Sequence, residues 1–111
     1  MIPPLEVHYR DDARTDLDTI FWYIAQTSAN PRTAFAYIKR LEERCRKIGE
    51  APRMGRIRDD LSPGLRTVAF ERSAIICYLI EDQIVWITNI FRRGRNFEAV
   101  LRGEQPESEN D

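Results

Sequence analysis

The sequence predicts an α+β fold in which an N-terminal strand and a helix hairpin pack on one face of a mainly antiparallel sheet, in the order βααβββ. Two observations support this prediction. Apolar residues recur at helical spacing before residue 54, and after residue 66 they run in short blocks rich in β-branched side chains. Between the two halves, Met54–Arg66 holds two glycines, a proline and several arginines, so we expect a basic joining loop.

The first element is expected to be a short strand. Leu5–Tyr9 alternates apolar and polar residues and follows a proline pair, which cannot donate to a sheet ladder. His8, the only histidine, falls on the polar face of this strand. We interpret it as a solvated side chain rather than a general base.

The first helix should follow directly. Asp11 and Asp12 offer N-caps, and the apolar residues after them fall on one helix face as far as about residue 28. Trp22 and Tyr23 flank this apolar face. They could form a partner-binding patch, although aromatic residues beside a core stripe usually form its edge.

The second helix has the clearest start signal in the chain. Asn30 provides an N-cap and Pro31 occupies the first helical position. Gly49 suits the C′ position, and Pro52 prevents the helix from continuing. The apolar stripe faces the first helix and predicts an antiparallel hairpin; it consists of Ala34, Ile38, Leu41, Cys45 and Ile48.

Three apolar blocks form the sheet half: Leu65–Phe70, Ala74–Ile80 and Ile84–Phe91. Three-residue polar segments separate them, which is short enough only for hairpins, so the blocks predict an antiparallel meander. The middle block is apolar on both faces, as in a central strand that is covered on both sides.

The helix hairpin can cover only one face of this sheet. An amphipathic turn at Phe97, Val100 and Leu101 could cover part of the other face. For the rest we expect a partner protein, in preference to complete cover by the chain itself, because a large bare apolar face usually marks a binding site.

Composition indicates one ordinary globular domain of 111 residues. All 17 basic residues and 14 of the 18 acidic ones lie in residues 1–103, so that part carries a net charge of +3. This is weak electrostatic support for nucleic-acid binding. Residues 104–111 hold the remaining acids, and we expect them to form an acidic disordered tail.

Several functional classes lack their signatures. Cys45 and Cys77 sit in apolar patterns and are expected to be buried, reduced thiols. No metal-ligand spacing, cofactor motif or nucleophile motif is present, so we predict no metal, no cofactor and no catalytic residues. No membrane span or leader pattern is found, and the expected compartment is the cytoplasm.

The remaining candidate for a binding site is a group of arginines. They occur around the joining loop and after the last strand, and the two segments could lie at the same end of the sheet. Such a cluster could bind phosphates or an acidic protein surface, but solvated arginines with one or two structural ion pairs explain it equally well. The arginines concerned are Arg53, Arg56, Arg58, Arg66, Arg92, Arg93 and Arg95.

The order of these segments resembles the ParE-type toxins of the RelE/ParE superfamily, from type II toxin–antitoxin systems. The resemblance covers roughly residues 5–97, with residues 1–103 as one RelE/ParE-like toxin domain. No single motif is specific, but their order and spacing together are. The matching segments are Ala13–Ala25, Asn30-Pro31 with Ala34, Tyr37 and Ile38, Pro52–Leu61, Pro63–Arg66, Ile75–Ile80 and Ile90–Arg95.

The resemblance implies a toxin that a cognate ParD-like antitoxin holds inactive. ParE-like members inhibit DNA gyrase by binding, whereas RelE-like members cleave mRNA on the ribosome, and a third possibility is a member that has lost toxicity. We assign target binding to Arg56, Arg58, Arg66, Arg92, Arg93 and Arg95. We assign antitoxin binding to Trp22, Tyr23, Tyr78 and Trp86.

The residues favour the gyrase inhibitor over the endonuclease. RNA cleavage by 2′-OH attack needs groups that take and deliver a proton. No Tyr or His follows Tyr78, and Phe91 and Phe97 occupy the region where a late acid–base residue is expected. A calculated pI near 5.9 also argues against docking on ribosomal RNA. We therefore predict a non-hydrolytic inhibitor without sequence-specific nucleic-acid binding.

Overall fold

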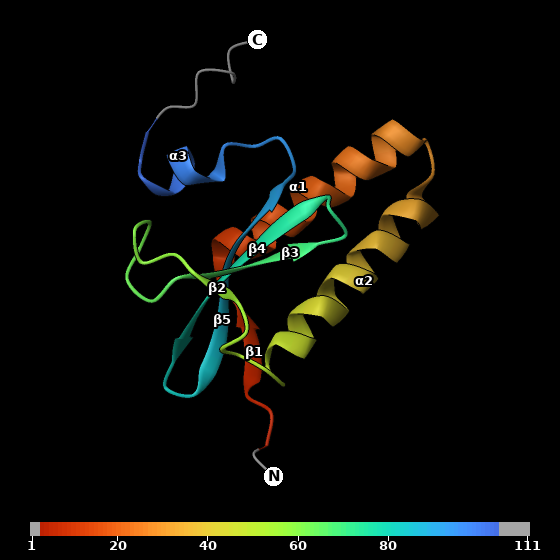
Figure 1. Cartoon of the computed structure of the whole chain (residues 1–111). Helices are drawn as coiled ribbons and strands as arrows, with labels where there is room; N and C mark the ends of the chain where they lie inside the picture. The colour runs from red at the N-terminus through yellow and green to blue at the C-terminus, as the bar shows by residue number, and fades with distance from the viewer. Residues whose placement is uncertain (1–2, 105–111) are drawn as a thin grey trace.

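The computed structural model describes residues 3–104 (Figure 1). The predicted acidic tail therefore lies outside the described residues, apart from Glu104. Within the described part, no helix is long and apolar enough to cross a membrane. The elements in chain order are β1 (Glu6–Tyr9), α1 (Asp11–Ser28), α2 (Pro31–Ile48), β2 (Arg56–Ile57), β3 (Arg66–Phe70), β4 (Ala74–Glu81), β5 (Ile84–Arg92) and α3 (Phe97–Leu101).

The strands form one sheet in the order β1-β5-β4-β3-β2. β3, β4 and β5 make the predicted antiparallel meander with β4 in the middle, while β1 lies parallel to β5 at one edge. The predicted α+β class is confirmed. The two-residue strand β2, which pairs with β3, was not predicted because Arg56 and Ile57 lie inside a glycine-rich loop.

The start of α1 differs from the prediction. Arg10, not Asp11 or Asp12, is the N-cap residue, and its side chain makes no capping bond. The reason is that the Arg10 backbone N–H donates to the Ile87 carbonyl at 2.9 Å, so the chain passes from the sheet straight into the helix. The two aspartates lie in the first turn, where the helix dipole still favours them.

The ends of α2 are only partly as predicted. The Asn30 side chain accepts from the Arg32 N–H, which confirms the cap. Gly49, however, is the C-cap residue with a right-handed φ of −60°, not a left-handed C′ residue. Space explains the glycine: a Cβ there would lie 2.3 Å from the Leu5 carbonyl oxygen. The Leu5 N–H donates to the Gly49 carbonyl at 2.9 Å, so this close approach ties the N-terminal segment to α2.

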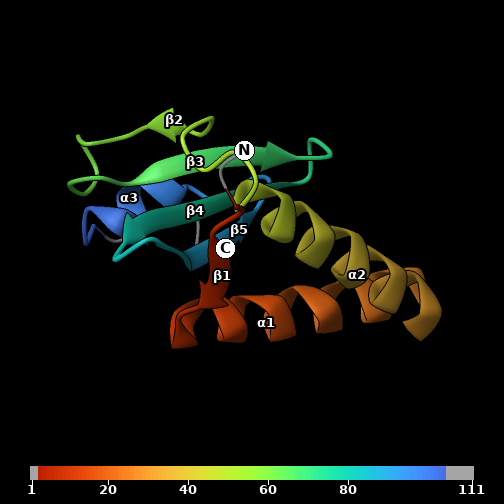
Figure 2. The same cartoon turned by 90° about the horizontal axis from the view of Figure 1, so that it is seen from below.

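The main core lies between the helix hairpin and one face of the sheet. Figure 2 shows α1 and α2 together on one side of the sheet and α3 on the other. Both predicted helix stripes face this core, and the buried thiol of Cys45 is part of it. The sheet contributes Val68, Phe70, Ala74, Ile76, Tyr78, Val85, Ile87 and Ile90.

The chain covers much of the second face itself. Cys77 and Phe91 are buried there beneath α3 and the joining loop, which supply Phe97, Val100, Leu101, Leu61 and Leu65. The predicted amphipathic turn is thus confirmed as α3, and the joining loop adds cover that was not predicted, so less of this face is left for the expected partner protein. On this face Ile75 and Leu79 of β4 stay partly exposed.

Both hairpin turns contain non-glycine residues with positive φ. Glu71 and Arg72 have φ values of 50° and 56°, and Asp82 and Gln83 have values of 51° and 63°. Asn and Gly are the residues that such turns prefer. All four residues therefore adopt the left-handed conformation without being glycine or asparagine.

Candidate binding surfaces

The joining loop is clamped onto the sheet by Tyr78. The Tyr78 hydroxyl accepts from the Gly55 N–H at 3.0 Å and donates to the Pro52 carbonyl at 2.7 Å. A Cβ at residue 55 would lie 2.4 Å from that hydroxyl oxygen, so only glycine fits. Burial raises the pKa of Tyr78. Its side chain is fully buried and is therefore not on a surface that a partner can contact.

Arg66 completes this clamp. Its Nη1 donates to the carbonyls of Arg53 at 2.8 Å and Gly55 at 3.0 Å. These bonds fix the loop across the start of β3. Arg66 was predicted to bind a target, and the structure instead uses its guanidinium within the chain.

Arg58 links the joining loop to α3. Its guanidinium donates to Asp60 at 2.9 and 3.0 Å and to Glu98 on α3 at 2.7 Å. The bond from Arg58 lowers the pKa of the Asp60 carboxyl. The Arg58 side chain is only 12% exposed, so it also serves the fold rather than a free binding surface.

The remaining predicted arginines lie in two places. Arg56 is exposed on β2. The other group lies at the far end of the meander, because Arg66 pairs with Tyr78 whereas Arg92 pairs with Ala74, four residues away along β4. This is about 13 Å along the strand. The expectation that both arginine segments lie at the same end of the sheet is therefore wrong.

At this far end four arginines gather into what we call the arginine ridge: Arg72, Arg92, Arg93 and Arg95. All four line one hollow of about 520 Å³, whose apolar floor includes Ile75 and Phe97. Three of them, all but Arg95, also line a second hollow beside Tyr23 and Tyr37. Sequence reasoning missed Arg72, since only the register of the β3–β4 hairpin brings it beside the end of β5.

The predicted antitoxin residues on α1 are exposed. Trp22 is 61% and Tyr23 45% exposed. Trp22 packs edge-on against Phe21, and Phe21 packs against Phe35 of α2, which is itself 60% exposed. We call Phe21, Trp22 and Phe35 the aromatic patch; it lines a groove of about 470 Å³ between the two helices. Phe35 was missed because it lies outside the core stripe of α2.

Trp86 lies apart from this patch, on the opposite face of the sheet. It is half-buried between His8 of β1 and Arg10, the N-cap of α1, with the His8 ring 5.1 Å away and the Arg10 guanidinium 4.7 Å from its ring. His8 in turn lies 2.9 Å from a Glu6 carboxylate oxygen. The four predicted antitoxin residues thus occupy three separate locations.

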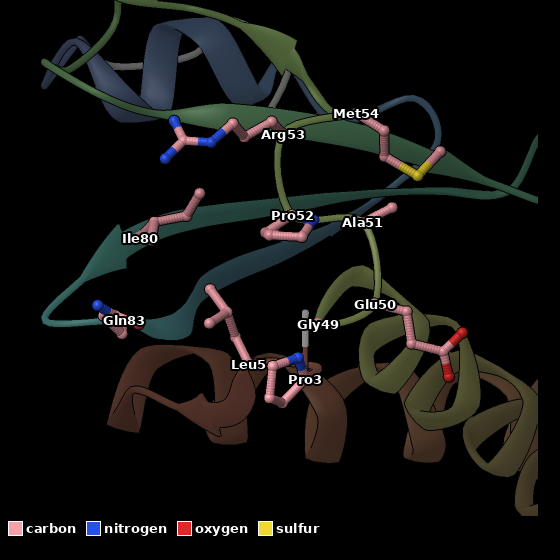
Figure 3. A pocket seen from close by; sticks show the side chains of 10 residues that line it. All are labelled: Pro3, Leu5, Gly49, Glu50, Ala51, Pro52, Arg53, Met54, Ile80 and Gln83. Atoms are coloured by element: carbon pink, nitrogen blue, oxygen red, sulfur yellow. The ribbon is translucent and has the colours of Figure 1, made fainter. Parts of the chain in front are cut away.

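A further hollow of about 650 Å³ opens where the end of α2 meets the β4–β5 hairpin (Figure 3). Its walls are largely apolar, with Leu5 and Ile80 on one side and Met54 on the other. Glu50 and Arg53 are the charged side chains in its lining. No sequence pattern predicted this hollow, because its lining residues come from three separate stretches of the chain.

The parallel edge strand, the helix hairpin and the meander together form a RelE/ParE-like fold. The family described as "ParE toxin of type II toxin-antitoxin system, parDE" matches residues 7–97. The chain therefore belongs to the ParE toxin family.

A known toxin agrees with this family assignment, and two solved structures share the fold. Toxin ParE3 of Caulobacter vibrioides is 31% identical over 86 residues, which cover 78% of this chain and 84% of that protein. The chromosomal ParDE toxin–antitoxin system from P. aeruginosa has a similar fold, with a TM-score of 0.69 at 21% identity, covering 79% of this chain and 95% of that one. The toxin–antitoxin complex RelBE2 from Mycobacterium tuberculosis gives a TM-score of 0.59 at 23% identity, covering 82% and 100%.

Proposed function

We propose that this chain inhibits DNA gyrase by binding to it in the cytoplasm, and that a cognate ParD-like antitoxin neutralises it. Membership of the ParE toxin family is the observation that carries the proposal. The target-binding surface consists of the exposed Arg56, Arg93 and Arg95 together with the half-buried Arg92. Arg58 and Arg66 support that surface indirectly, since both are bound within the chain.

The antitoxin contact is proposed at the exposed aromatic residues of α1. Trp22 and Tyr23, together with Phe35, present apolar area that the fold leaves open. Aromatic side chains of this kind are the usual anchors of protein interfaces. The fold neighbours in P. aeruginosa and M. tuberculosis are toxin–antitoxin systems, which is consistent with a protein partner for this chain too.

A ribosome-dependent endonuclease is the less favoured function. General acid–base catalysis needs a titratable group close to the reacting phosphate. The hollow that all four ridge arginines line includes Phe97 and neither His nor Tyr, and the two tyrosines of the second hollow, Tyr23 and Tyr37, are engaged with Arg92 and Ser73. His8 lies on β1, beside Glu6 and Trp86. We therefore propose inhibition by binding rather than cleavage.

A supercoiling assay tests the proposed function. Induced expression without the antitoxin should leave plasmid DNA less negatively supercoiled, and the purified chain should inhibit gyrase in vitro. Co-expression of the antitoxin should restore supercoiling. Normal supercoiling during growth arrest, with new 5′ ends in translated messages, would contradict the proposal and support the endonuclease.

Two double variants that remove the same positive charge test where the gyrase-binding surface lies. Arg92→Ala/Arg93→Ala should weaken gyrase inhibition by about tenfold or more, because two guanidinium contacts are removed. Lys39→Ala/Lys47→Ala removes two exposed charges from the outer face of α2 and should inhibit like the parent chain. Equal inhibition by both variants would contradict the assignment of the arginines.

A further inference from the structure

We propose that the arginine ridge is a binding site for the phosphodiester backbone of nucleic acid, so that this chain contacts DNA directly and without sequence preference. The ridge consists of Arg72, Arg92, Arg93 and Arg95, as defined above. Guanidinium groups bind phosphate oxygens through paired N–H donors, and several in one place can follow a phosphate chain.

The fold brings these arginines together from two stretches of the chain. Arg72 lies in the β3–β4 turn, Arg92 ends β5, and Arg93 and Arg95 follow in the loop to α3. The turn and the strand end are joined by a 2.7 Å bond from the Arg93 N–H to the Ser73 carbonyl. The Tyr37 hydroxyl on α2 lies 2.7 Å from the Ser73 hydroxyl, which fixes the turn to the helix hairpin.

The side chains are also positioned before any ligand arrives. The Arg92 guanidinium lies 3.7 Å from the centre of the Tyr23 ring, and an Arg93 nitrogen donates to the Arg72 carbonyl at 3.3 Å. Arg95 lies above the Phe91 ring at 5.9 Å. Held in this way, the guanidiniums lose less conformational entropy on binding than free arginines would.

The charge of the ridge is not cancelled by the carboxylates nearest to it in the chain and fold. Glu71, the residue before Arg72, is held by a two-point ion pair with Arg40 of α2 at 2.8 and 3.1 Å. Asp16 of α1 attracts Arg95 and so offsets part of the charge of the ridge, but it accepts from the Ile90 N–H at 2.8 Å and is half-buried, and burial raises its pKa. Neither hollow beside the ridge has an acidic residue in its lining.

Aromatic neighbours favour nucleic acid over an acidic peptide as the ligand. Tyr23 is 45% exposed beside Arg92, and Phe97 lies partly exposed in the hollow on the other side. Proteins that bind single strands without sequence preference combine a basic groove with aromatic side chains on which bases stack. An acidic peptide would use the guanidiniums but has no planar bases for these rings.

Salt-dependent binding to the full chain tests the inference. Fluorescence anisotropy with a labelled oligothymidylate of about 20 nucleotides should show affinity that falls between about 50 and 200 mM salt. Arg72→Ala/Arg93→Ala should raise Kd about 10- to 30-fold at 100 mM salt and reduce the salt slope by about 1.4, the value for two lost contacts to a single strand. Lys39→Ala/Lys47→Ala removes the same charge from α2 and should leave both quantities nearly unchanged.

Competitors distinguish the ligand classes. RNA and duplex DNA share the phosphodiester backbone and should displace the probe, whereas polyglutamate at equal charge should displace it poorly. The inference would be overturned if the two double variants lost affinity for the oligonucleotide equally. It would also be overturned if polyglutamate displaced the probe as strongly as DNA does. Binding of this kind needs no gyrase, so a chain that binds DNA and leaves gyrase active would contradict the proposed function alone.

Discussion

At the scale of single residues, the same chemistry that suits a binding surface also suits the interior of a loop. Arg66 and Tyr78 both carry groups able to hold a partner, and both are directed instead at backbone groups of Pro52, Arg53 and Gly55. A loop with few apolar residues needs such bonds, because its backbone polar groups lie against the sheet. The result is an ordered joining loop.

Removing the Tyr78 hydroxyl should destabilise the fold. In Tyr78→Phe the buried Gly55 N–H loses its acceptor and the Pro52 carbonyl loses its donor. We expect a loss of about 1–3 kcal/mol in the free energy of unfolding, measured by urea denaturation. Tyr23→Phe, at a half-exposed ring, is the matched control and should change stability by under about 0.5 kcal/mol. Equal stability of both variants would contradict the clamp.

At the scale of elements, local sequence patterns predicted most of the fold. The stripes of both helices, the Asn30 cap and the three meander strands follow from periodicity and turn signals, and all are confirmed. The misplaced cap of α1 has a tertiary cause, since the Arg10 backbone is engaged by Ile87. Likewise, the sequence suggested that residue 49 is glycine because of its backbone conformation at the end of α2. The structure shows that glycine is needed there because the Leu5 carbonyl oxygen of another segment leaves no room for a Cβ.

The binding surfaces were harder to predict because they depend on pairing between distant segments. The sequence identifies the arginines but does not show which of them are bound within the chain. It therefore could not distinguish Arg58, which is bound to Glu98 on α3, from the exposed Arg93. Nor could it find Arg72, whose place in the ridge depends on the hairpin register. Burial of Tyr78 follows from its place on the helix-facing side of the central strand.

The position of α3 provides an element-scale prediction. Arg58→Met keeps the length of the side chain but removes the bonds to Asp60 and Glu98, so α3 should separate more often from the second face. Hydrogen exchange of the α3 amides should become several-fold faster, while amides of α2 keep their rates. Arg102→Met, which removes an exposed 3.5 Å contact with Asp60, should have little effect on either. Unchanged exchange in Arg58→Met would show that apolar packing alone holds α3.

At the scale of the whole molecule, the aromatic patch and the arginine ridge lie at the two sides of one helix. Tyr23 of α1 supports Arg92 of the ridge, and the neighbouring Trp22 belongs to the patch. An antitoxin segment that follows α1 from the patch would therefore reach the ridge. Neutralisation could then work by covering the arginines, with the patch supplying the affinity.

This arrangement predicts that antitoxin binding and toxicity can be separated. Trp22→Ser/Phe35→Ser removes two exposed anchors and should weaken antitoxin binding by about 700-fold, because hot-spot aromatics contribute about 2 kcal/mol each and the pair therefore about 4 kcal/mol. Gyrase inhibition should persist, since the arginine ridge is untouched. Met54→Ser/Ile57→Ser makes the same kind of change at side chains 58% and 55% exposed on the joining loop and β2. Calorimetric titration of the antitoxin should show parent-like affinity for this control, and equal weakening in both variants would place the antitoxin contact elsewhere.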